Sequence, residues 1–224
     1  MVNYSEFEMG IAFAQTLQSG NIPFLRQPQA VYKEILSVQG IPDFVILNDK
    51  RGLPDLVPAN LSHLGSISRV LANLKPKAGR SRLYLYRKTG LSIFTLNMAL
   101  RVLLRNNLIA HRDKKFYVNP EFSFERTIWA FELKLEDWKR ALFQAMQYRA
   151  FANYSVTVFP MEKENLLKAN LPMFVGLDIG VLLFDRENQK AKWLFRPKKQ
   201  APISKWQAIY MYLKLRMTFD KKVL

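Results

Sequence analysis

The sequence predicts an α/β protein whose main domain is interrupted by a second, strongly basic domain. Residues 126–160 have the apolar pattern of a strand, a helix and a second strand, which is a βαβ unit. Residues 61–120 have three helical patterns instead, and they contain twelve Lys or Arg but a single acid. We expect the α/β domain to comprise residues 1–55 and 121–224, and the inserted domain to comprise residues 56–120.

Before the insertion we expect one helix and two strands. Residues 4–18 have helical spacing and precede a Ser-Gly pair, which is typical of a helix end. Residues 31–38 fit either a strand or a short helix, whereas the apolar run at residues 44–47 indicates a strand. If residues 31–38 are a strand, the Gln-Gly pair that follows is the turn of a hairpin.

The inserted domain is predicted to hold three helices and a β-hairpin. Apolar spacing indicates helices at residues 61–74, 82–88 and 92–106, and Ser92 can cap the third. Residues 108–120 contain a strand, a charged turn and a strand. Three helices followed by a basic hairpin is the order of a winged helix-turn-helix.

Residues 89–120 resemble the winged helices of bacterial and archaeal regulators and of plasmid replication initiators. The resemblance implies that the helix at residues 92–106 enters the major groove of DNA and that the hairpin is the wing. A small helical domain that packs internally and is merely basic is the alternative. The residues expected to contact DNA are Arg80, Arg82, Arg87, Lys88, Ser92, Thr95, Asn97, Arg101, Arg105, Arg112, Lys114 and Lys115.

After the insertion the chain is predicted to alternate between strands and helices. The βαβ unit begins with a strand at Thr127, continues with a helix capped by Asp137, and ends with a strand at residues 154–159. The later elements are a polar helix at residues 161–170, strands at residues 173–184 and 191–196, and a closing helix at residues 204–219.

Two charged side chains interrupt the first strand of the βαβ unit. Glu132 and Lys134 are two residues apart, so they point to the same face of the strand. A buried strand rarely carries an acid and a base without a function for them. Asp43 precedes the apolar run at residues 44–47, so two carboxylates and an ammonium group can meet if the two strands are neighbours. Such carboxylates are preferred ligands of Mg²⁺.

This pattern, Pro42-Asp43 with Glu132-Leu133-Lys134, resembles the PD-(D/E)xK, or restriction-endonuclease-like, nuclease superfamily. The resemblance implies a mixed central sheet flanked by helices, and hydrolysis of phosphodiester bonds with Mg²⁺ or, in its place, Mn²⁺. Asp43 and Glu132 are then the expected metal ligands, and Lys134 the residue that positions the attacking water.

Further site residues are expected from the same resemblance. Gln144 and Tyr148 fall on the helix after the strand, where many relatives carry a Gln and a Tyr that face the site. Glu34 faces the site if residues 31–38 form a strand, and Glu8 is a candidate helper because relatives often place an acid in the first helix. Asp55, in a second Pro-Asp pair, competes with Asp43 but lies in a polar, Pro-rich stretch.

Composition excludes several other classes of protein. The net charge of +16 indicates a polyanionic partner. The chain has no cysteine and two isolated histidines, which excludes disulfides and thiolate zinc sites. No Gly-rich phosphate-binding loop occurs, so we expect no nucleotide cofactor. Neither a membrane-spanning run nor a signal peptide is recognised, and we expect a cytoplasmic protein of a bacterium or archaeon without membrane contact.

The favoured hypothesis is therefore a Mg²⁺-dependent endonuclease that cuts double-stranded DNA at specific sequences, in restriction or another defence against mobile DNA. Cutting both strands with one site per chain suggests a homodimer. The alternative hypothesis is a non-catalytic winged-helix regulator or replication initiator that uses the nuclease-like core as a scaffold. RNA as the substrate and a structural interaction module are further alternatives.

Overall fold

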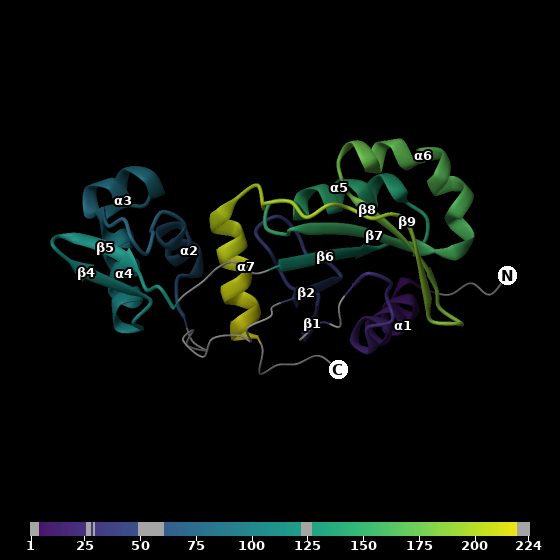
Figure 1. Ribbon diagram of the computed structural model, residues 1–224, viewed down its shortest axis with the longest axis horizontal. Helices are drawn as coiled ribbons and strands as arrows, with labels where there is room; N and C mark the ends of the chain where they lie inside the picture. Colours follow the sequence, from purple (N-terminus) through teal and green to yellow (C-terminus); the bar gives the residue numbers. More distant parts are fainter. Residues whose placement is uncertain (1–4, 26–27, 29, 49–60, 122–126, 219–224) are drawn as a thin grey trace. The chain divides into compact units, whose positions relative to one another are not determined.

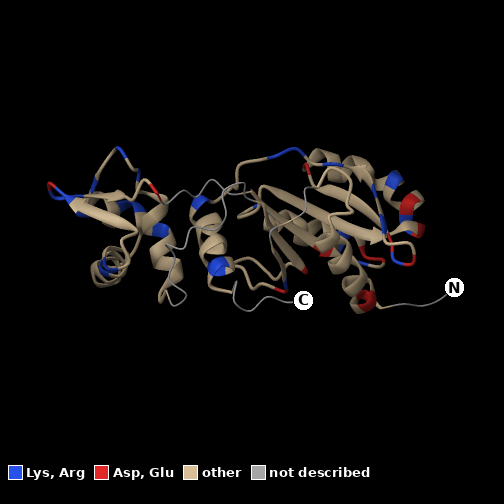
Figure 2. Ribbon diagram, turned by 60° about the horizontal axis from the view of Figure 1, so that its bottom comes forward, with Lys and Arg blue, Asp and Glu red and all other residues tan. Residues whose placement is uncertain are grey.

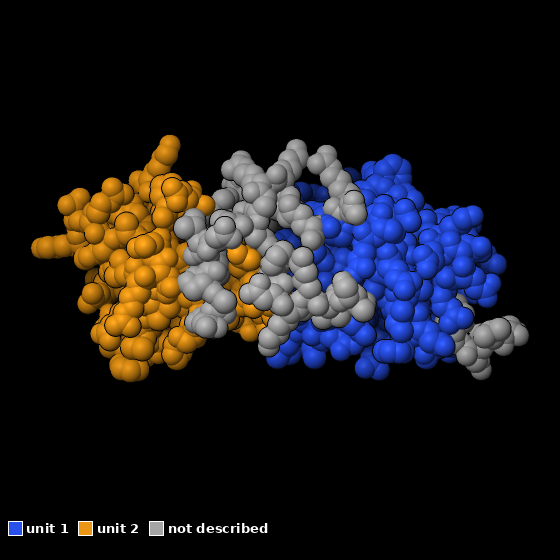
Figure 3. Space-filling model, turned by 90° about the horizontal axis from the view of Figure 1, so that it is seen from below, with its two compact units in different colours: residues 1–49, 127–203, 222–224 blue, residues 50–126, 204–221 orange. Residues whose placement is uncertain are grey.

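The computed structural model describes residues 5–25, 28, 30–48, 61–121 and 127–218 of the chain. The described residues fall into two compact units, each built from separated stretches of sequence (Figure 3). The larger unit contains the described residues of 1–49 and 127–203, and the smaller unit contains those of 50–126 and 204–221.

A six-stranded mixed sheet forms the centre of the larger unit (Figure 1). The pairs β6–β7 and β7–β8 are parallel and the other pairs are antiparallel, so the βαβ unit is joined to a hairpin on each side. In spatial order the strands are β1 (Ala30–Lys33), β2 (Phe44–Asn48), β6 (Thr127–Leu133), β7 (Tyr154–Pro160), β8 (Gly180–Asp185) and β9 (Lys190–Phe195).

Helices cover both faces of this sheet (Figure 1). α1 (Glu6–Ser19) packs on one face, where the Phe13 ring makes edge-to-face contacts with Phe44, Phe131 and Phe184 at centroid distances of 5.3–5.8 Å. α5 (Trp138–Tyr148) and α6 (Glu164–Gly176) enclose a second apolar cluster with residues of β7 and β8. The predicted mixed sheet flanked by helices is confirmed at this level.

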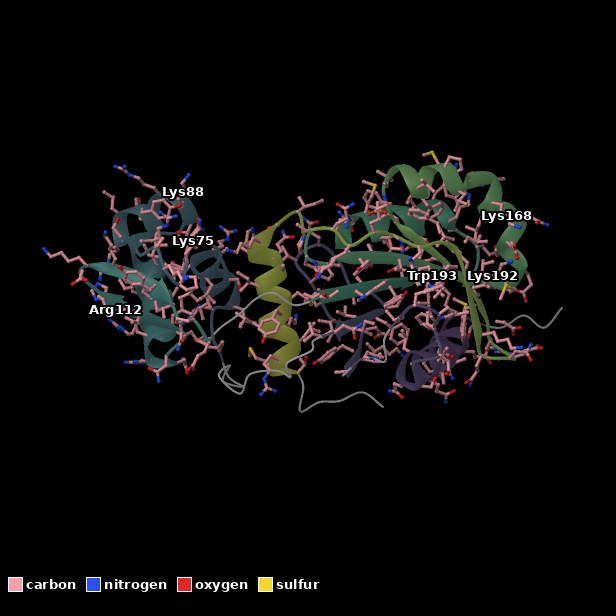
Figure 4. The ribbon with its side chains drawn as sticks, viewed as in Figure 1. Lys75, Lys88, Arg112, Lys168, Lys192 and Trp193 are labelled. Carbon is pink, nitrogen blue, oxygen red and sulfur yellow. The ribbon has the colours of Figure 1, made fainter. Side chains whose placement is uncertain are left out.

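Neighbouring residues of β9 show how the sheet separates its two faces. Lys192 Nζ pairs with Glu164 of α6 at 2.8 Å, whereas Trp193 packs against the cluster around α1. The indole nitrogen of Trp193 donates to the carbonyl oxygen of Pro23 at 2.8 Å. Figure 4 labels Lys192 and Trp193 together with Lys168, which also pairs with Glu164.

Local sequence signals account for both ends of α1 and for the start of α5. Ser5 accepts a hydrogen bond from the Glu8 amide while the Glu8 carboxylate accepts one from the Ser5 amide, which is a capping box at the start of α1. α1 ends where Gly20 adopts a left-handed φ of 73°. Asp137 caps α5 by accepting from the Arg140 amide at 2.9 Å, as predicted from the sequence.

Two predicted elements of the larger unit have different bounds. The expected strand at residues 173–184 is helical up to Gly176, and its strand part begins at Gly180. In this last helical turn Phe174 is buried while Met173 and Val175 are exposed, which is also the alternation of a half-buried strand, so the apolar pattern alone predicted the wrong element here. Of the predicted strand at residues 31–38, pairing with β2 ends at Lys33 because Glu34 has a positive φ of 50°.

The smaller unit combines helices with a three-stranded antiparallel sheet in the order β3-β5-β4. A two-residue turn joins β4 to β5, and both of its residues, Asp113 and Lys114, have positive φ, as a type I′ turn requires. The elements are α2 (Leu64–Ala72), β3 (Arg80–Ser81), α3 (Arg82–Thr89), α4 (Ile93–Arg105), β4 (Ile109–Arg112), β5 (Lys115–Val118) and α7 (Lys205–Met217).

The closing helix α7, expected in the α/β domain, packs on α2 in the smaller unit. The Arg69 guanidinium of α2 lies 4.8 Å from the centre of the Trp206 ring of α7. In α4, Phe94 belongs to the same apolar pattern as the core residues Leu96 and Leu103. Leu96 and Leu103 are buried there, but Phe94 is 74% exposed and points away from the core.

Candidate active site

The pairing of β2 with β6 brings Asp43 to Glu132, which lies 89 positions later in the sequence. Phe44 pairs with Phe131 in the antiparallel register, so one step further along Asp43 lies opposite Glu132 on the same face of the sheet. The Leu133 amide donates to Asp43 Oδ2 at 2.7 Å. This hydrogen bond fixes the Asp43 carboxylate beside the end of β6.

Glu132 is a buried carboxyl group, only 1% exposed. Its Oε2 accepts a hydrogen bond from the Tyr148 hydroxyl at 2.6 Å, and its Oε1 lies 3.3 Å from Lys134 Nζ. The Tyr148 hydroxyl also lies 3.1 Å from the carbonyl oxygen of Ile41. Since a hydroxyl has one proton, Tyr148 can donate either to ionised Glu132 or to Ile41 while accepting from protonated Glu132.

Lys134 is held at the end of β6 by three oxygen groups. Its Nζ lies 2.9 Å from the carbonyl oxygen of Leu133, 3.2 Å from Glu6 Oε2 and 3.3 Å from Glu132 Oε1. Three acceptors match the three protons of an ammonium group. Lys134 therefore has a fixed position, although the side chain is still 12% exposed and can reach a ligand at the surface.

The surroundings of the three side chains alter their ionisation. Burial and the nearby Asp43 charge raise the pKa of Glu132 to about 7, against the weaker lowering effects of Tyr148 and Lys134. Burial also raises the pKa of Asp43, although the Leu133 amide and Lys134 oppose this. For Lys134, burial favours the neutral amine, but Glu132, Glu6 and Asp43 together outweigh it and raise the pKa. Lys134 is therefore held as a cation, and Glu132 keeps its proton to a higher pH than an ordinary glutamate does.

Of two further predicted site residues, Gln144 lies beside the site and Glu34 does not. Gln144 is partly buried on α5, where its side chain hydrogen-bonds Tyr148, while its side-chain oxygen has no partner among the residues that the structure describes. Glu34, expected to face inward, is instead 66% exposed at the end of β1, because the chain leaves the strand there, and its carboxylate lies 3.7 Å from Lys33 Nζ. The Glu34 charge still acts on Asp43, whose pKa it raises.

Glu6 takes the place that the sequence analysis assigned to Glu8. Glu8 belongs to the capping box of α1 and pairs with Arg186 Nη1 at 3.3 Å, so its carboxylate is directed away from Lys134. Glu6, two residues earlier, lies on another side of the helix and reaches Lys134. The capping-box sequence was the signal that could have separated the two acids. Asp55, the competitor of Asp43, lies outside the described residues.

The site offers a set of oxygen atoms that suits a small divalent cation. Asp43, Glu132 and the carbonyl oxygen of Leu133 are hard donors, and Mg²⁺ is commonly held by one or two carboxylates while it keeps several waters. No group of three or more Asp, Glu or His that could hold a metal occurs in the described part of the chain. The residues fit Mg²⁺ bound by two carboxylates, water and a substrate phosphate, whereas they do not form an all-protein cage.

The smaller unit presents a basic surface with few acids (Figure 2). Its described acids are Asp113 and Glu121. Figure 4 shows that Lys75, Lys88 and Arg112 come from different parts of this unit. The exposed side chains among those predicted to contact DNA are Arg82, Arg87 and Lys88 of α3, Ser92 before α4, Arg101 and Arg105 of α4, and Arg112, Lys114 and Lys115 of the hairpin.

Four of the residues predicted to contact DNA, Arg80, Ser92, Thr95 and Asn97, cap α4, contact a ring or are half-buried. Ser92 Oγ caps α4 by accepting from the Thr95 amide at 3.1 Å, and the two hydroxyl groups lie 2.8 Å apart. The Arg80 guanidinium lies 4.6 Å from the centre of the Tyr84 ring. Asn97 is half-buried on α4. The exposed Arg and Lys side chains are therefore the ones freest to meet a polyanion.

Comparison with known proteins gives no relative: no family model, no curated protein and no solved structure matches this chain. Among the described residues, no helix has the length and apolar character needed to cross a bilayer.

Proposed function

We propose that this protein is a metal-dependent endonuclease that hydrolyses phosphodiester bonds in duplex DNA. The observation that carries the proposal is the buried Glu132, placed between Asp43 and Lys134 at one end of the sheet. Burying a carboxyl group and raising its pKa to about 7 costs stability, and such groups are concentrated at functional sites. A carboxylate pair beside a cation suits a reaction at a phosphate group.

Each side chain has a role in this proposal. Asp43 and Glu132 would hold Mg²⁺, which supplies charge neutralisation at the phosphate and an acidified water. Lys134, a fixed cation, orients the attacking water and stabilises the negative charge that grows on the phosphate oxygens. Tyr148 orients Glu132. Attack of water on phosphorus breaks the P–O3′ bond, which leaves a 5′-phosphate and a 3′-hydroxyl.

The smaller unit would deliver DNA to this site as a winged helix. Its order of three helices and a hairpin, together with the exposed bases of α3, α4 and the hairpin tip, supports the role. Neutralising phosphates releases counterions, so we expect affinity to fall steeply with salt. A homodimer would cut both strands, and defence against mobile DNA is the proposed setting.

A non-catalytic DNA-binding regulator is the second candidate. It is favoured by the contacts of Glu132, because Tyr148 and Lys134 already engage both of its oxygens, as in a purely structural buried pair. In that case Asp43, Glu132 and Lys134 would only stabilise the fold of the larger unit.

Cleavage of supercoiled plasmid separates the two candidates. The wild type is incubated with Mg²⁺, with Mn²⁺ and with EDTA, in parallel with Glu132→Gln and with the control Glu164→Gln, which alters a partly exposed acid that pairs with two surface lysines. The nuclease proposal expects cutting with either metal by the wild type and the control, and none with EDTA or Glu132→Gln. DNA binding without cutting under every condition would favour the regulator.

A further inference from the structure

The smaller unit contains a groove whose lining differs from a plain basic surface. The groove lies between α4 and the β4–β5 hairpin and has a volume of about 400 Å³. That volume is within the range of pockets that take small ligands. Its apolar lining comes from Leu100 and Leu104 of α4 and from Phe116 of β5. Leu104 is 36% exposed, so part of this apolar surface is in contact with solvent.

An aromatic pair forms the hairpin side of the groove. His111 of β4 lies directly opposite Phe116 of β5, and the two rings stack with centroids 4.4 Å apart and an angle of 23° between their planes. Phe116 is buried, whereas His111 is exposed. Stacked rings with one exposed member can receive a further flat ring, as aromatic platforms in proteins that bind single strands do.

On the helix side, Asn97 contributes an amide that its neighbours do not fully use. Its side-chain oxygen is shielded from water and has no hydrogen-bond partner within the described residues. A shielded acceptor without a partner costs free energy, and a turn of the Asn97 amide toward the groove would let a ligand with a suitable donor recover it. The amide group has both a donor and an acceptor, which matches the edge of a nucleobase.

Three arginines surround this apolar and aromatic surface. Arg82 comes from the start of α3, and Arg101 and Arg105 come from α4. All three side chains are exposed, and no described acid lines the groove. Guanidinium groups bind phosphate oxygens in a bidentate manner, so the rim can hold the phosphates on either side of a bound ring.

From this juxtaposition we propose that the groove binds one nucleotide that has left the base stack. The smaller unit then prefers DNA that carries an unpaired nucleotide to a perfectly paired duplex. In paired DNA the neighbouring bases cover each π-face and only base edges reach the grooves, so a concave site with a ring platform has no matching surface. The inference rests on the proposed DNA binding, and it adds a substrate class: duplex DNA with a local unpaired position.

The test measures DNA affinity of the full chain in EDTA, where no metal-dependent cutting occurs. Two fluorescent duplexes of the same sequence are compared by anisotropy, one perfectly paired and one with a single extra nucleotide. Because one stacked base contributes about 1–3 kcal/mol, we expect the second duplex to bind roughly tenfold more tightly to the wild type.

Groove variants test whether this preference comes from the groove. Leu104→Trp fills it without changing any charge, so the preference should fall to roughly twofold or less while the affinity for paired DNA is kept. Asn97→Ala removes the amide and should weaken the preference as well. This variant tests the role of the groove if Leu104→Trp does not fold. Lys88→Ala removes an exposed charge that does not line the groove and should weaken both duplexes equally.

Several outcomes would overturn the inference. Equal affinity of the wild type for the two duplexes would do so, and so would a preference that persists in both folded groove variants. Displacement of paired DNA by a free deoxynucleoside monophosphate, without any preference between the duplexes, would assign the groove to a free nucleotide instead. Binding to neither duplex would contradict both the proposed DNA-binding role of the smaller unit and this inference. Plasmid cutting tests the active site independently.

Discussion

The two units use charge in opposite ways. In the larger unit a few charges are buried or half-buried, and each has defined partners: Lys134 contacts Glu132 and Glu6 at 3.2–3.3 Å. In the smaller unit many positive charges are exposed on α3, α4 and the hairpin. Buried charges interact strongly with one another, whereas exposed charges are screened by water and salt and act almost independently. The comparison therefore predicts large, specific effects in the first unit and small, additive effects in the second.

The largest expected effect is the loss of cleavage in Lys134→Ala. Removing one positioned group that stabilises transition-state charge typically lowers kcat by roughly 10²–10³-fold. Lys163→Ala is the matched control, because Lys163 pairs with the exposed Glu136 at the surface. Single-turnover cleavage of a labelled duplex measures the effect. Equal cleavage rates for the two variants would show that Lys134 has no role in the reaction.

The next largest effect is a change in the free energy of unfolding with pH. The pKa of Glu132 is raised from 4.5 to about 7, so the folded state binds more protons than the unfolded state between these values. Without metal, stability should therefore fall as pH rises from 5 to 8, by about 3 kcal/mol for such a shift. The raised pKa of Asp43 acts in the same direction, and Lys134 stays charged throughout this range.

Urea unfolding in EDTA at pH 5 and pH 8 tests this effect, with Glu132→Gln as the variant. Glutamine stays neutral, and Tyr148 can accept from its amide while donating to Ile41, so the variant should exceed the wild type in stability at pH 8. Glu164→Gln is the control, since the pKa of that partly exposed acid is lowered by its two lysine partners. Wild-type stability that rises between pH 5 and pH 8 would contradict the account.

A smaller effect is expected from Glu6, which fixes Lys134 from α1. Half-exposed ion pairs contribute about 0.2–1 kcal/mol, so Glu6→Gln should slow cleavage roughly two- to fivefold. Glu8→Gln is the matched control on the same helix, because it pairs with Arg186 and caps α1. Glu8→Gln should lower the melting temperature and leave the cleavage rate close to that of the wild type. A greater loss of cleavage in the Glu8 variant would reverse the assignment.

The smallest effect is expected from single charges of the smaller unit. Arg101→Ala should lower the slope of log affinity against log salt by about 0.9, with a modest loss of affinity at any one salt concentration. Lys168→Ala, in a surface ion pair of the larger unit, is the control and should leave the slope unchanged. Slopes that are equal for the wild type and Arg101→Ala would show that Arg101 does not contact phosphate.

The sequence predicts that Asp43, Glu132 and Lys134 lie together, because strand periodicity determines which side chains share a face. Glu132 and Lys134 lie two residues apart on a buried strand, and Asp43 lies at the start of another apolar run. The three side chains meet once the two strands are neighbours, as they are in the sheet. Such local regularities also gave most of the helices and strands, including the cap of α5 at Asp137.

Features that depend on packing between distant segments could not be found in this way. The capping-box sequence assigns Glu8 to the start of α1, but only the docking of α1 on the sheet shows that Glu6 reaches Lys134. Similarly, the apolar residues of α7 do not show that its partner is α2. Phe94 has the spacing of a core residue, yet α4 turns it to solvent.

The most direct test of the central claim measures cleavage and affinity on the same labelled duplex, for the wild type and Glu132→Gln. Affinity is measured in EDTA, and cutting is started with Mg²⁺. We predict equal affinities, with cutting by the wild type alone to give products with a 5′-phosphate. Cutting by the variant at the wild-type rate would contradict a catalytic role for the buried carboxyl group and would place the chemistry elsewhere in the chain.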